Sequence, residues 1–241
     1  MITCFVQPIC DMNYGQAEYL ELLVRDVNKD GTHSNSADAV FRKIKTAGER
    51  KKLDLIMFGQ AIMLSNQIPL KMCINLSKET MEQERSADIF LEFARKYEHN
   101  RGQIVFEINE KVNTMEPAPN ENIRLLVRGG YKIALDDVDE RMENVQAVSQ
   151  LNGIEMIKTG CGLVKHMDCE NVQKLYQLIE TARQNHVRLT VEGIETAEQE
   201  ETICKIARMM RYQNLYLQGF VYGYPEKAGV YAEKVEKAMT C

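Results

Sequence analysis

The sequence predicts an α/β fold in which eight strand-helix units close into a single (β/α)8 TIM-like barrel. The chain has 241 residues, close to the roughly 250 that such a barrel needs. Short apolar runs rich in β-branched residues alternate with helical segments at about 30 residues per unit, which is typical of a parallel sheet. The first strand is not followed by a glycine-rich GxGxxG turn, which an open doubly wound sheet would usually have. Strand number and length therefore favour a closed barrel.

The first two strand-like runs, residues 4–9 and 19–24, are separated by only about ten residues. This separation is too short for a helical crossover, so we expect a hairpin that leaves one strand antiparallel to the rest of the barrel. The remaining strands are expected at residues 71–76, 103–108, 131–135, 154–157, 187–191 and 215–217.

Helical spacing is clear between the later runs. Leu175, Leu178, Ile179 and Ala182 fall at i, i+3, i+4 and i+7 and share one helix face. Thr196 with Gln199 three residues later has the pattern of a capping box.

The most loop-like stretches are residues 28–38 and 113–122. Residues 26–31 begin like a calcium-binding EF-hand loop, but Ala37 stands where that loop needs its glutamate, so we expect an ordinary polar loop. With no internal repeat or linker in the sequence, residues 1–241 are expected to form one domain.

Composition excludes several classes of partner. The chain has 30 Lys and Arg residues against 35 Asp and Glu residues. It has no long run of basic residues that would bind the phosphate backbone of a polymeric nucleic acid. No stretch approaches the roughly 20 apolar residues that cross a bilayer, and the start lacks a basic-then-apolar leader. We therefore expect a cytoplasmic protein without a membrane segment.

Neither cysteine nor histidine spacing indicates a metal site. The seven cysteines have no CxxC spacing and are expected to be free, buried thiols, and the four histidines have no HxxxH pairing.

Polar residues stand where the predicted strands end, and this pattern indicates the function. In a parallel barrel all these ends meet at one rim, where such barrels build active sites. The rim collects five carboxylates, an amide pair and a lysine: Glu21, Asn75, Glu107, Asp136, Asp137, Lys158, Glu192 and Gln218.

Five acids in a small space raise one another's pKa values, so they require cations. Oxygen ligands suit Mg²⁺ or Mn²⁺, and the adjacent Asp136 and Asp137 can hold two ions about 4 Å apart, an arrangement used for displacement at phosphorus. Taken singly, each residue also has an ordinary explanation as a helix cap, a turn residue or a solvated lysine.

The ordered motifs resemble those of the EAL-domain family over essentially the whole chain. Glu21-Leu22-Leu23, followed by Val24-Arg25, is similar to the signature that names it. Further similar segments follow in the family's order, namely FVQPI at 5–9, INLS at 74–77, FEINE at 106–110, ALDD at 134–137, IK at 157–158, VEGIE at 191–195 and QGF at 218–220 with Pro225.

The resemblance implies a metal-dependent phosphodiesterase that hydrolyses cyclic-di-GMP to the linear dinucleotide pGpG in bacterial signalling. It implies one Mg²⁺ or Mn²⁺ on Glu21, Asn75, Glu107 and Asp136, and a second held by Asp136 and Asp137. It further implies that Lys158 contacts the activated water, Glu192 supports the metal-water network, Gln218 positions water or substrate, Arg25 meets a phosphate, Gln7 lines the nucleotide site and Glu110 fastens the loop after Asp137.

Two departures from the family pattern leave a second hypothesis open. Residues 138–144 (VDERMEN) replace the family's Gly-Thr-Gly-Tyr-Ser-Ser-type loop, which couples metal binding to dimerisation, and Gly160 replaces an aspartate. Leu22 in place of the family's alanine is a smaller change. The alternative is a catalytically weak or inactive module that binds cyclic-di-GMP or a protein partner, and a homodimer is also possible. Another metal-dependent barrel, such as an enolase relative or a glycerophosphodiesterase, would also use rim carboxylates, but would not explain the ordered motifs.

Overall fold

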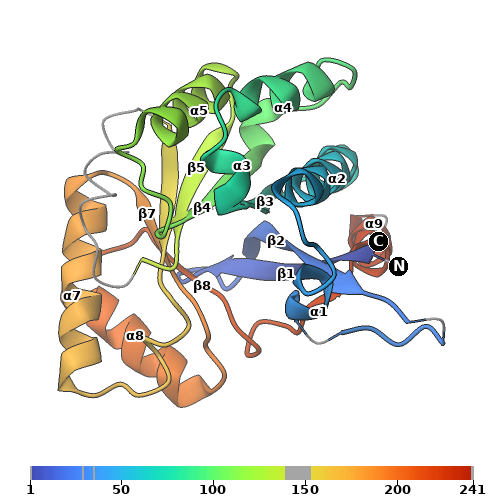
Figure 1. Ribbon diagram of the computed structural model, residues 1–241. Coiled ribbons are helices and arrows are strands. Elements are labelled where there is room, and N and C mark those ends of the chain that lie inside the picture. The colour runs from blue at the N-terminus through green and yellow to red at the C-terminus, as the bar shows by residue number, and fades with distance from the viewer. Residues whose placement is uncertain (1, 29, 35, 139–152, 240–241) are drawn as a thin grey trace.

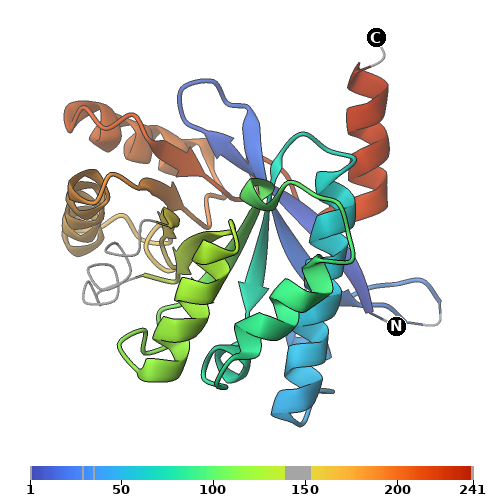
Figure 2. The same cartoon turned by 90° about the horizontal axis from the view of Figure 1, so that it is seen from above.

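The strands of the computed structural model form a closed barrel with helices around it (Figures 1 and 2). The structure describes residues 2–28, 30–34, 36–138 and 153–239. Strands follow the order β2-β3-β4-β5-β6-β7-β8-β1, and β1 pairs back to β2. Neighbours from β2 to β8 are parallel, whereas β1 is antiparallel to both β2 and β8. The predicted barrel and its antiparallel strand are confirmed.

The strands lie where the apolar runs predict them, with shifts at their ends. They are β1 (Ile2–Asp11), β2 (Ala17–Asp26), β3 (Lys71–Leu76), β4 (Ile104–Asn109), β5 (Lys132–Asp136), β6 (Ile154–Lys158), β7 (Arg188–Val191), β8 (Leu215–Leu217) and β9 (Glu226–Lys227). The short β9 pairs with β1 outside the barrel wall.

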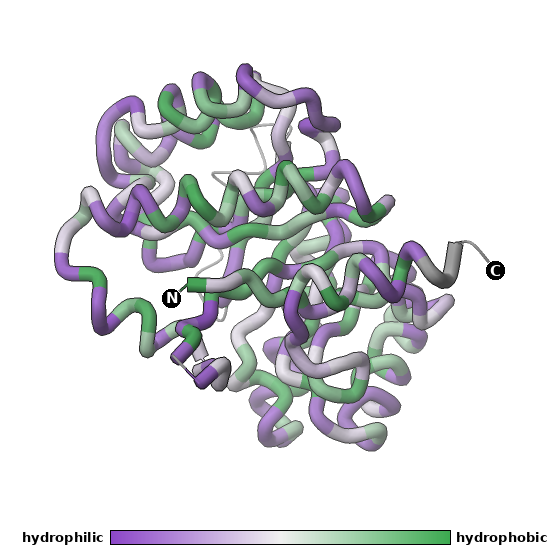
Figure 3. Tube along the Cα trace, turned by 90° about the vertical axis from the view of Figure 1, so that its right-hand side faces the viewer, coloured by the Kyte–Doolittle hydropathy of each residue, from purple (hydrophilic) through white to green (hydrophobic). Residues whose placement is uncertain are grey.

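The helices pack their apolar faces on the outside of the strands. They are α1 (Asp38–Phe41), α2 (Ala47–Ser65), α3 (Lys78–Met81), α4 (Ser86–Ala94), the 3-10 helix η1 (Arg101–Gln103), α5 (Pro117–Arg128), α7 (Cys169–Gln184), α8 (Ala197–Met209) and α9 (Ala228–Met239). The predicted face of α7 is buried as expected, and Thr196 and Gln199 form the predicted capping box of α8. Figure 3 shows hydrophobic and hydrophilic residues alternating along the helices.

The core has two parts. The larger part lies between the strands and the helices. The smaller part fills the barrel interior with one residue from each of β1 to β6 and from β8: Ile9, Tyr19, Cys73, Val105, Ala134, Met156 and Tyr216. The interior is thus packed, and access to the strand ends is from the rim.

A polar cluster closes the barrel at the end opposite the predicted site. Glu155 Oε1 accepts hydrogen bonds from Tyr19 Oη at 2.7 Å and from Arg188 Nη1 at 2.8 Å. Lys71 forms an ion pair with the same carboxylate, and Tyr216 stands edge-on to Tyr19 with ring centroids 5.4 Å apart. The side chains of this polar cluster come from the amino-terminal ends of the strands. In such barrels that end serves stability.

The β1-β2 hairpin extends past the barrel wall. The two strands pair from Ile2 and Asp26 inward to Gln7 and Glu21, whereas β3 pairs with β2 only at residues 19–22. The outer half therefore forms an arm, visible at the right of Figure 1. Residues 27 and 33 form a β-bridge that folds the following loop back on this arm, so the predicted polar loop is partly ordered as a tight turn.

Four of the cysteines predicted to be buried are buried, but Cys161 and Cys169 are exposed free thiols, and Cys241 lies outside the described residues. Cys161 follows β6 and lines a pocket at the rim. In the part of the chain that the structure describes, we find no helix long and apolar enough to span a membrane.

Candidate active site

The rim at the carboxyl ends of the strands brings the predicted site residues together. Neighbouring strands place Gln7 opposite Glu21 and Asn75 beside Glu107. Glu21, Glu107, Asp136 and Lys158 lie on β2, β4, β5 and β6, while Glu192 and Gln218 directly follow β7 and β8. Strand register, which the sequence alone does not give, decides these contacts.

Lys158 lies at the centre of four carboxylates. Its Nζ is 2.7 Å from Glu107 Oε1 and from Glu192 Oε1, 3.3 Å from Glu21 Oε2 and 3.6 Å from Asp136 Oδ1. The side chain is fully buried. One ammonium group thus partly neutralises four acids inside the barrel mouth.

Amide side chains link these acids to one another and to β1. Asn75 Nδ2 donates to Glu21 Oε1 at 3.1 Å and to Glu107 Oε2 at 3.2 Å. Gln218 Nε2 donates to Glu21 Oε2 at 2.7 Å and to Gln7 Oε1 at 3.3 Å. Gln7 in turn donates from Nε2 to the carbonyl of Gly223 at 3.0 Å. The amides fix the orientation of Glu21 from both sides.

The burial and crowding of the acids shift their pKa values. Burial raises the pKa of Glu107 well above its usual range despite Lys158, and it also raises that of Asp136. Burial likewise raises the pKa of Glu192 to about 8. For Glu21, burial is outweighed by Lys158 and the hydrogen bonds, so its pKa is lowered. Burial lowers the pKa of Lys158, but the four carboxylates raise it well above its usual range, so it stays protonated.

The donor set fits a hard cation in its chemistry. Four side-chain oxygens here are buried without a hydrogen-bond partner among the described residues: Glu107 Oε1, Asp136 Oδ1, Glu192 Oε1 and Gln218 Oε1. Three of them nevertheless form ion pairs with Lys158: the two glutamate oxygens lie 2.7 Å and Asp136 Oδ1 lies 3.6 Å from its Nζ. Within the described ranges, however, no three acids, histidines or cysteines are already arranged around one ion position, because these acids converge on Lys158. A metal would take Oδ1 of Asn75, whose Nδ2 now faces Glu21 and Glu107.

The paired aspartates point to different partners. Asp136 lies toward Lys158, whereas Asp137 Oδ2 accepts a hydrogen bond from Asn109 Nδ2 at 2.6 Å. Asp137 adopts a left-handed backbone with φ 57°, which aspartate tolerates better than most residues. The backbone N–H of Glu110 donates to the carbonyl of Asp136 at 2.9 Å. The two carboxylates thus have different partners, although the charge of Asp137 acts on Asp136 and helps to raise its pKa.

The divergent loop falls almost entirely outside the described residues, which stop at Val138. Val138 is buried, and its N–H donates to the carbonyl of Lys158 at 3.0 Å. The role predicted for Glu110 concerns residues 139–144, which lie outside the described part, and therefore stays a prediction.

Two supporting residues were not predicted. Thr159 Oγ1 accepts a hydrogen bond from the N–H of Glu192 at 3.2 Å. Asp54 of α2 accepts from Ser77 Oγ and Thr80 Oγ1, both at 2.6 Å, and so fixes the turn after Asn75. Their roles arise from contacts between segments distant in the sequence.

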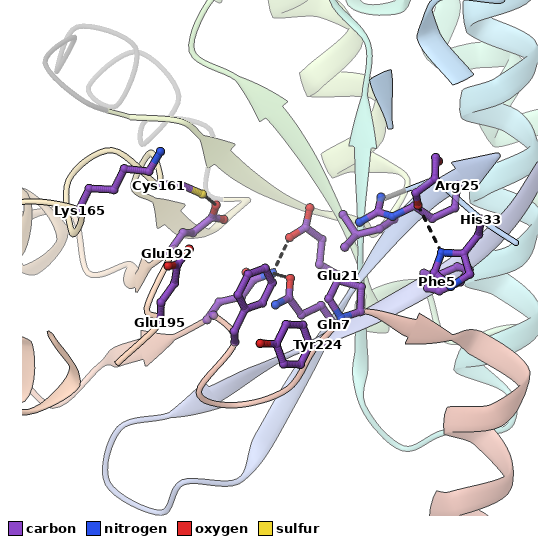
Figure 4. A pocket seen from close by; sticks show the side chains of 17 residues that line it. Phe5, Gln7, Glu21, Arg25, His33, Cys161, Lys165, Glu192, Glu195 and Tyr224 are labelled. Carbon is purple, nitrogen blue, oxygen red and sulfur yellow. Dashed lines mark hydrogen bonds between the residues drawn. The ribbon is translucent and has the colours of Figure 1, made fainter. Parts of the chain in front are cut away.

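A pocket of about 800 Å³ opens beside the carboxylates (Figure 4). Arg25, Phe5 and His33 lie at one end, Glu21 and Gln7 in the middle, and Glu192, Cys161 and Lys165 at the other. The stacked rings of Phe220 and Tyr224, with centroids 4.5 Å apart, form part of its wall. Its size suits a nucleotide-sized ligand.

The comparison with known families decides the classification. A family model described as the EAL domain matches residues 2–225. The chain belongs to the EAL-domain family.

Known relatives of this EAL domain are distant in sequence. A curated relative from Escherichia coli (strain K12), named "Probable cyclic di-GMP phosphodiesterase PdeB", is 24% identical over 200 residues, which cover 81% of this chain and 38% of the relative. The chain therefore spans less than half the length of that protein.

Solved EAL structures share the fold. The EAL enzyme Bd1971 in its "cAMP and cyclic-di-GMP bound form" superposes with a TM-score of 0.82 at 17% identity, covering 97% of this chain and 64% of that one. The "PaMucR Phosphodiesterase, c-di-GMP complex" gives 0.80 at 16% identity, covering 95% and 94%. An EAL domain protein from Listeria monocytogenes EGD-e gives 0.81 at 18% identity, covering 98% and 92%.

Proposed function

We propose that this EAL domain hydrolyses one phosphodiester of cyclic-di-GMP and releases the linear dinucleotide pGpG. The observation that carries the proposal is the buried cluster of four carboxylates around Lys158 beside a nucleotide-sized pocket. The relative's name and the ligands of the structural neighbours agree with it. Residues 1–241 would act as one cytoplasmic domain, and a homodimer or protein partner remains part of the proposal.

Glu21, Asn75, Glu107 and Asp136 would hold one Mg²⁺ or Mn²⁺, and Asp137 would join Asp136 at a second. When bound, such ions lower the pKa of water and neutralise phosphate charge. The buried oxygens of Glu107 and Asp136, whose charge only Lys158 offsets among the described residues at the site, support this assignment. Asp137 would first have to release Asn109, which holds its Oδ2.

The reaction forms a bond between a water oxygen and phosphorus and breaks one ester bond to ribose, whose oxygen receives a proton. Lys158 would face the charge that develops on phosphorus, which is the position where a fixed cation helps most. Glu192, with its raised pKa, would hold the water's proton, and Gln218 would orient water or substrate. Arg25 would bind a phosphate oxygen, and Gln7 would line the nucleotide site.

A second candidate function is a binding module without turnover. One observation favours it: the carboxylates gather on Lys158 rather than around an ion position. A protein of this kind would bind cyclic-di-GMP through the pocket and leave it intact.

Incubation of the purified protein with cyclic-di-GMP and Mn²⁺, followed by separation of the products, tests the proposal. Formation of pGpG supports the enzyme. Binding of intact cyclic-di-GMP without any pGpG supports the binding module instead.

A further inference from the structure

The arm of the β1-β2 hairpin forms the floor at one end of the pocket. Side chains alternate across a strand, so the stripe that begins with Gln7 and Glu21 at the rim continues outward through paired Phe5 and Leu23 to paired Thr3 and Arg25. Phe5, Leu23 and Arg25 all line the pocket. β3 pairs with β2 only as far as Leu22, so among the described residues no strand pairs with the outer part of β2 along that edge.

His33 lies over this floor. The bridge between residues 27 and 33 and the hydrogen bond from the N–H of Ser34 to the carbonyl of Asp26, at 2.9 Å, return the loop to the arm. The imidazole then rests on Phe5, with ring centroids 4.5 Å apart and planes tilted by 58°. Phe5 is buried, whereas His33 is exposed and lines the pocket. One side of the imidazole is thus supported, and the residue remains open to a ligand.

Arg25 supplies the second observation that points to a ligand. Arg25 is only 7% exposed, yet within the described part of the chain its side chain makes a single hydrogen bond, from Nη1 to the carbonyl of Val24 at 2.9 Å. The charge of Glu21 acts on the guanidinium, but no ion pair within 4 Å joins the two groups. A guanidinium has five N–H donors, and a buried charge is costly unless it is paired. The buried cation therefore faces the pocket with donors to spare, beside the Phe5-His33 pair.

We propose that His33, supported by Phe5, is the surface on which a purine base of the ligand stacks at the Arg25 end of the pocket. This inference deepens the proposed function, on which it rests, by naming the residue that recognises one nucleotide half. An anionic phosphate beside Arg25 places the attached nucleoside over the arm, where Leu23 and the imidazole offer an apolar edge and a flat ring. Stacking needs the ring and not its nitrogens.

The test compares three substitutions in the full chain, with binding measured by calorimetry for cyclic-di-GMP and for guanosine monophosphate. His33→Ala removes the ring and is expected to weaken binding of both ligands by about 10-fold, the scale of one base-aromatic stack. His33→Phe keeps a flat ring without nitrogens and is expected to stay within about 3-fold of the wild type. His166→Ala, at an exposed histidine outside the pocket lining, is the matched control and should change neither affinity.

Unchanged binding of both ligands to His33→Ala would overturn the inference. Equal losses for His33→Phe and His33→Ala would also overturn it, because they would assign the contact to the ring nitrogens. Guanosine monophosphate separates this inference from the proposed function. If the wild type binds guanosine monophosphate but not cyclic-di-GMP, the proposed substrate is wrong. Weaker binding of guanosine monophosphate to His33→Ala, but not to His33→Phe, would still support the stacking site.

Discussion

Lys158 contacts four of the predicted acids at once, at 2.7 to 3.6 Å. If it stabilises charge on the reacting phosphorus, Lys158→Ala should reduce cyclic-di-GMP turnover by about 100-fold or more and leave nucleotide affinity largely intact. Steady-state kinetics and direct binding measured in parallel separate the two effects. Equal losses of binding and turnover would instead make Lys158 a contact to the bound phosphate.

A substitution of Asp136 tests whether this residue is a metal ligand. Its Oδ1 has no hydrogen-bond partner among the described residues, so it is available as a ligand. Asp136→Asn should weaken Mn²⁺ binding by at least about 10-fold, because a charged ligand becomes a neutral one, and calorimetry without nucleotide measures this. Asp88→Asn, at an exposed aspartate paired with Arg85, is the control and should leave the affinity unchanged. A wild type that binds neither Mg²⁺ nor Mn²⁺ at millimolar concentration would contradict the assignment.

Among single residues, the sequence predicted those whose type and position at a strand end are distinctive, such as Glu107 and Lys158. It did not predict Thr159, Asp54 or His33. Thr159 and Asp54 act through hydrogen bonds to Glu192 and Ser77, and His33 reaches Phe5 only because a loop folds back. Such contacts depend on three-dimensional packing that no local pattern encodes.

At the scale of elements, the strands of the first hairpin are longer than their apolar runs. The apolar runs at residues 4–9 and 19–24 lie within these strands, and the structure extends β1 to Ile2–Asp11 and β2 to Ala17–Asp26. The added outer residues include Arg25, which lines the pocket, and Asp26, which forms an ion pair with Lys43. Apolar patterning therefore located the two strands but not their polar outer ends.

The ion cluster at the starts of β2, β3, β6 and β7 is expected to stabilise the barrel. Removing the charge of Glu155 leaves Arg188 and Lys71 without their buried carboxylate, so Glu155→Gln should lower the free energy of unfolding by roughly 2–3 kcal/mol. Denaturant unfolding measures the change. Glu82→Gln, in an exposed pair with Lys78, is the control and should cost no more than about 0.5 kcal/mol. A similar small cost for Glu155→Gln would contradict the role of the cluster.

The carboxyl group of Glu155 also makes the free energy of unfolding depend on pH. Although burial raises its pKa, hydrogen bonds from Lys71 and Tyr19 and the charge of Arg188 outweigh burial, so the folded-state pKa of Glu155 is lowered. Its stabilisation is therefore fully present above the unfolded pKa of about 4.3 and is lost as the pH falls through the lower folded value. Wild type and Glu155→Gln should converge in stability at acidic pH.

The divergent segment after Asp137 is expected to limit turnover, and a graft of the family loop tests this expectation. Val138 is buried and bonded to β6, so the graft should begin at residue 139 to keep that side chain. Replacing residues 139–144 with the family's glycine-containing loop removes the negative charges of Asp139, Glu140 and Glu143 and restores backbone freedom. We expect higher cyclic-di-GMP turnover and measure the dimer fraction alongside it. No gain with folding intact would refute the loop explanation.

At the scale of the whole molecule, the barrel turns a pattern spread over about 200 residues into one site. Parallel strands bring Glu21 and Gln218, 197 positions apart in sequence, to 2.7 Å. The sequence could predict that these residues share a rim, because that follows from parallel topology alone. It could not predict that the acids close on Lys158, or that Asp137 turns to Asn109, because those choices depend on register and on the left-handed backbone at Asp137.

We infer that the acids around Lys158 form a hydrolytic centre for cyclic-di-GMP. Product analysis of wild type, Lys158→Ala and Asp136→Asn after incubation with cyclic-di-GMP and Mn²⁺ tests it most directly. We predict pGpG from the wild type, a loss of at least about 100-fold in Lys158→Ala, and reduced formation in Asp136→Asn that added Mn²⁺ partly restores. Intact cyclic-di-GMP bound by a wild type that forms no pGpG would contradict the claim.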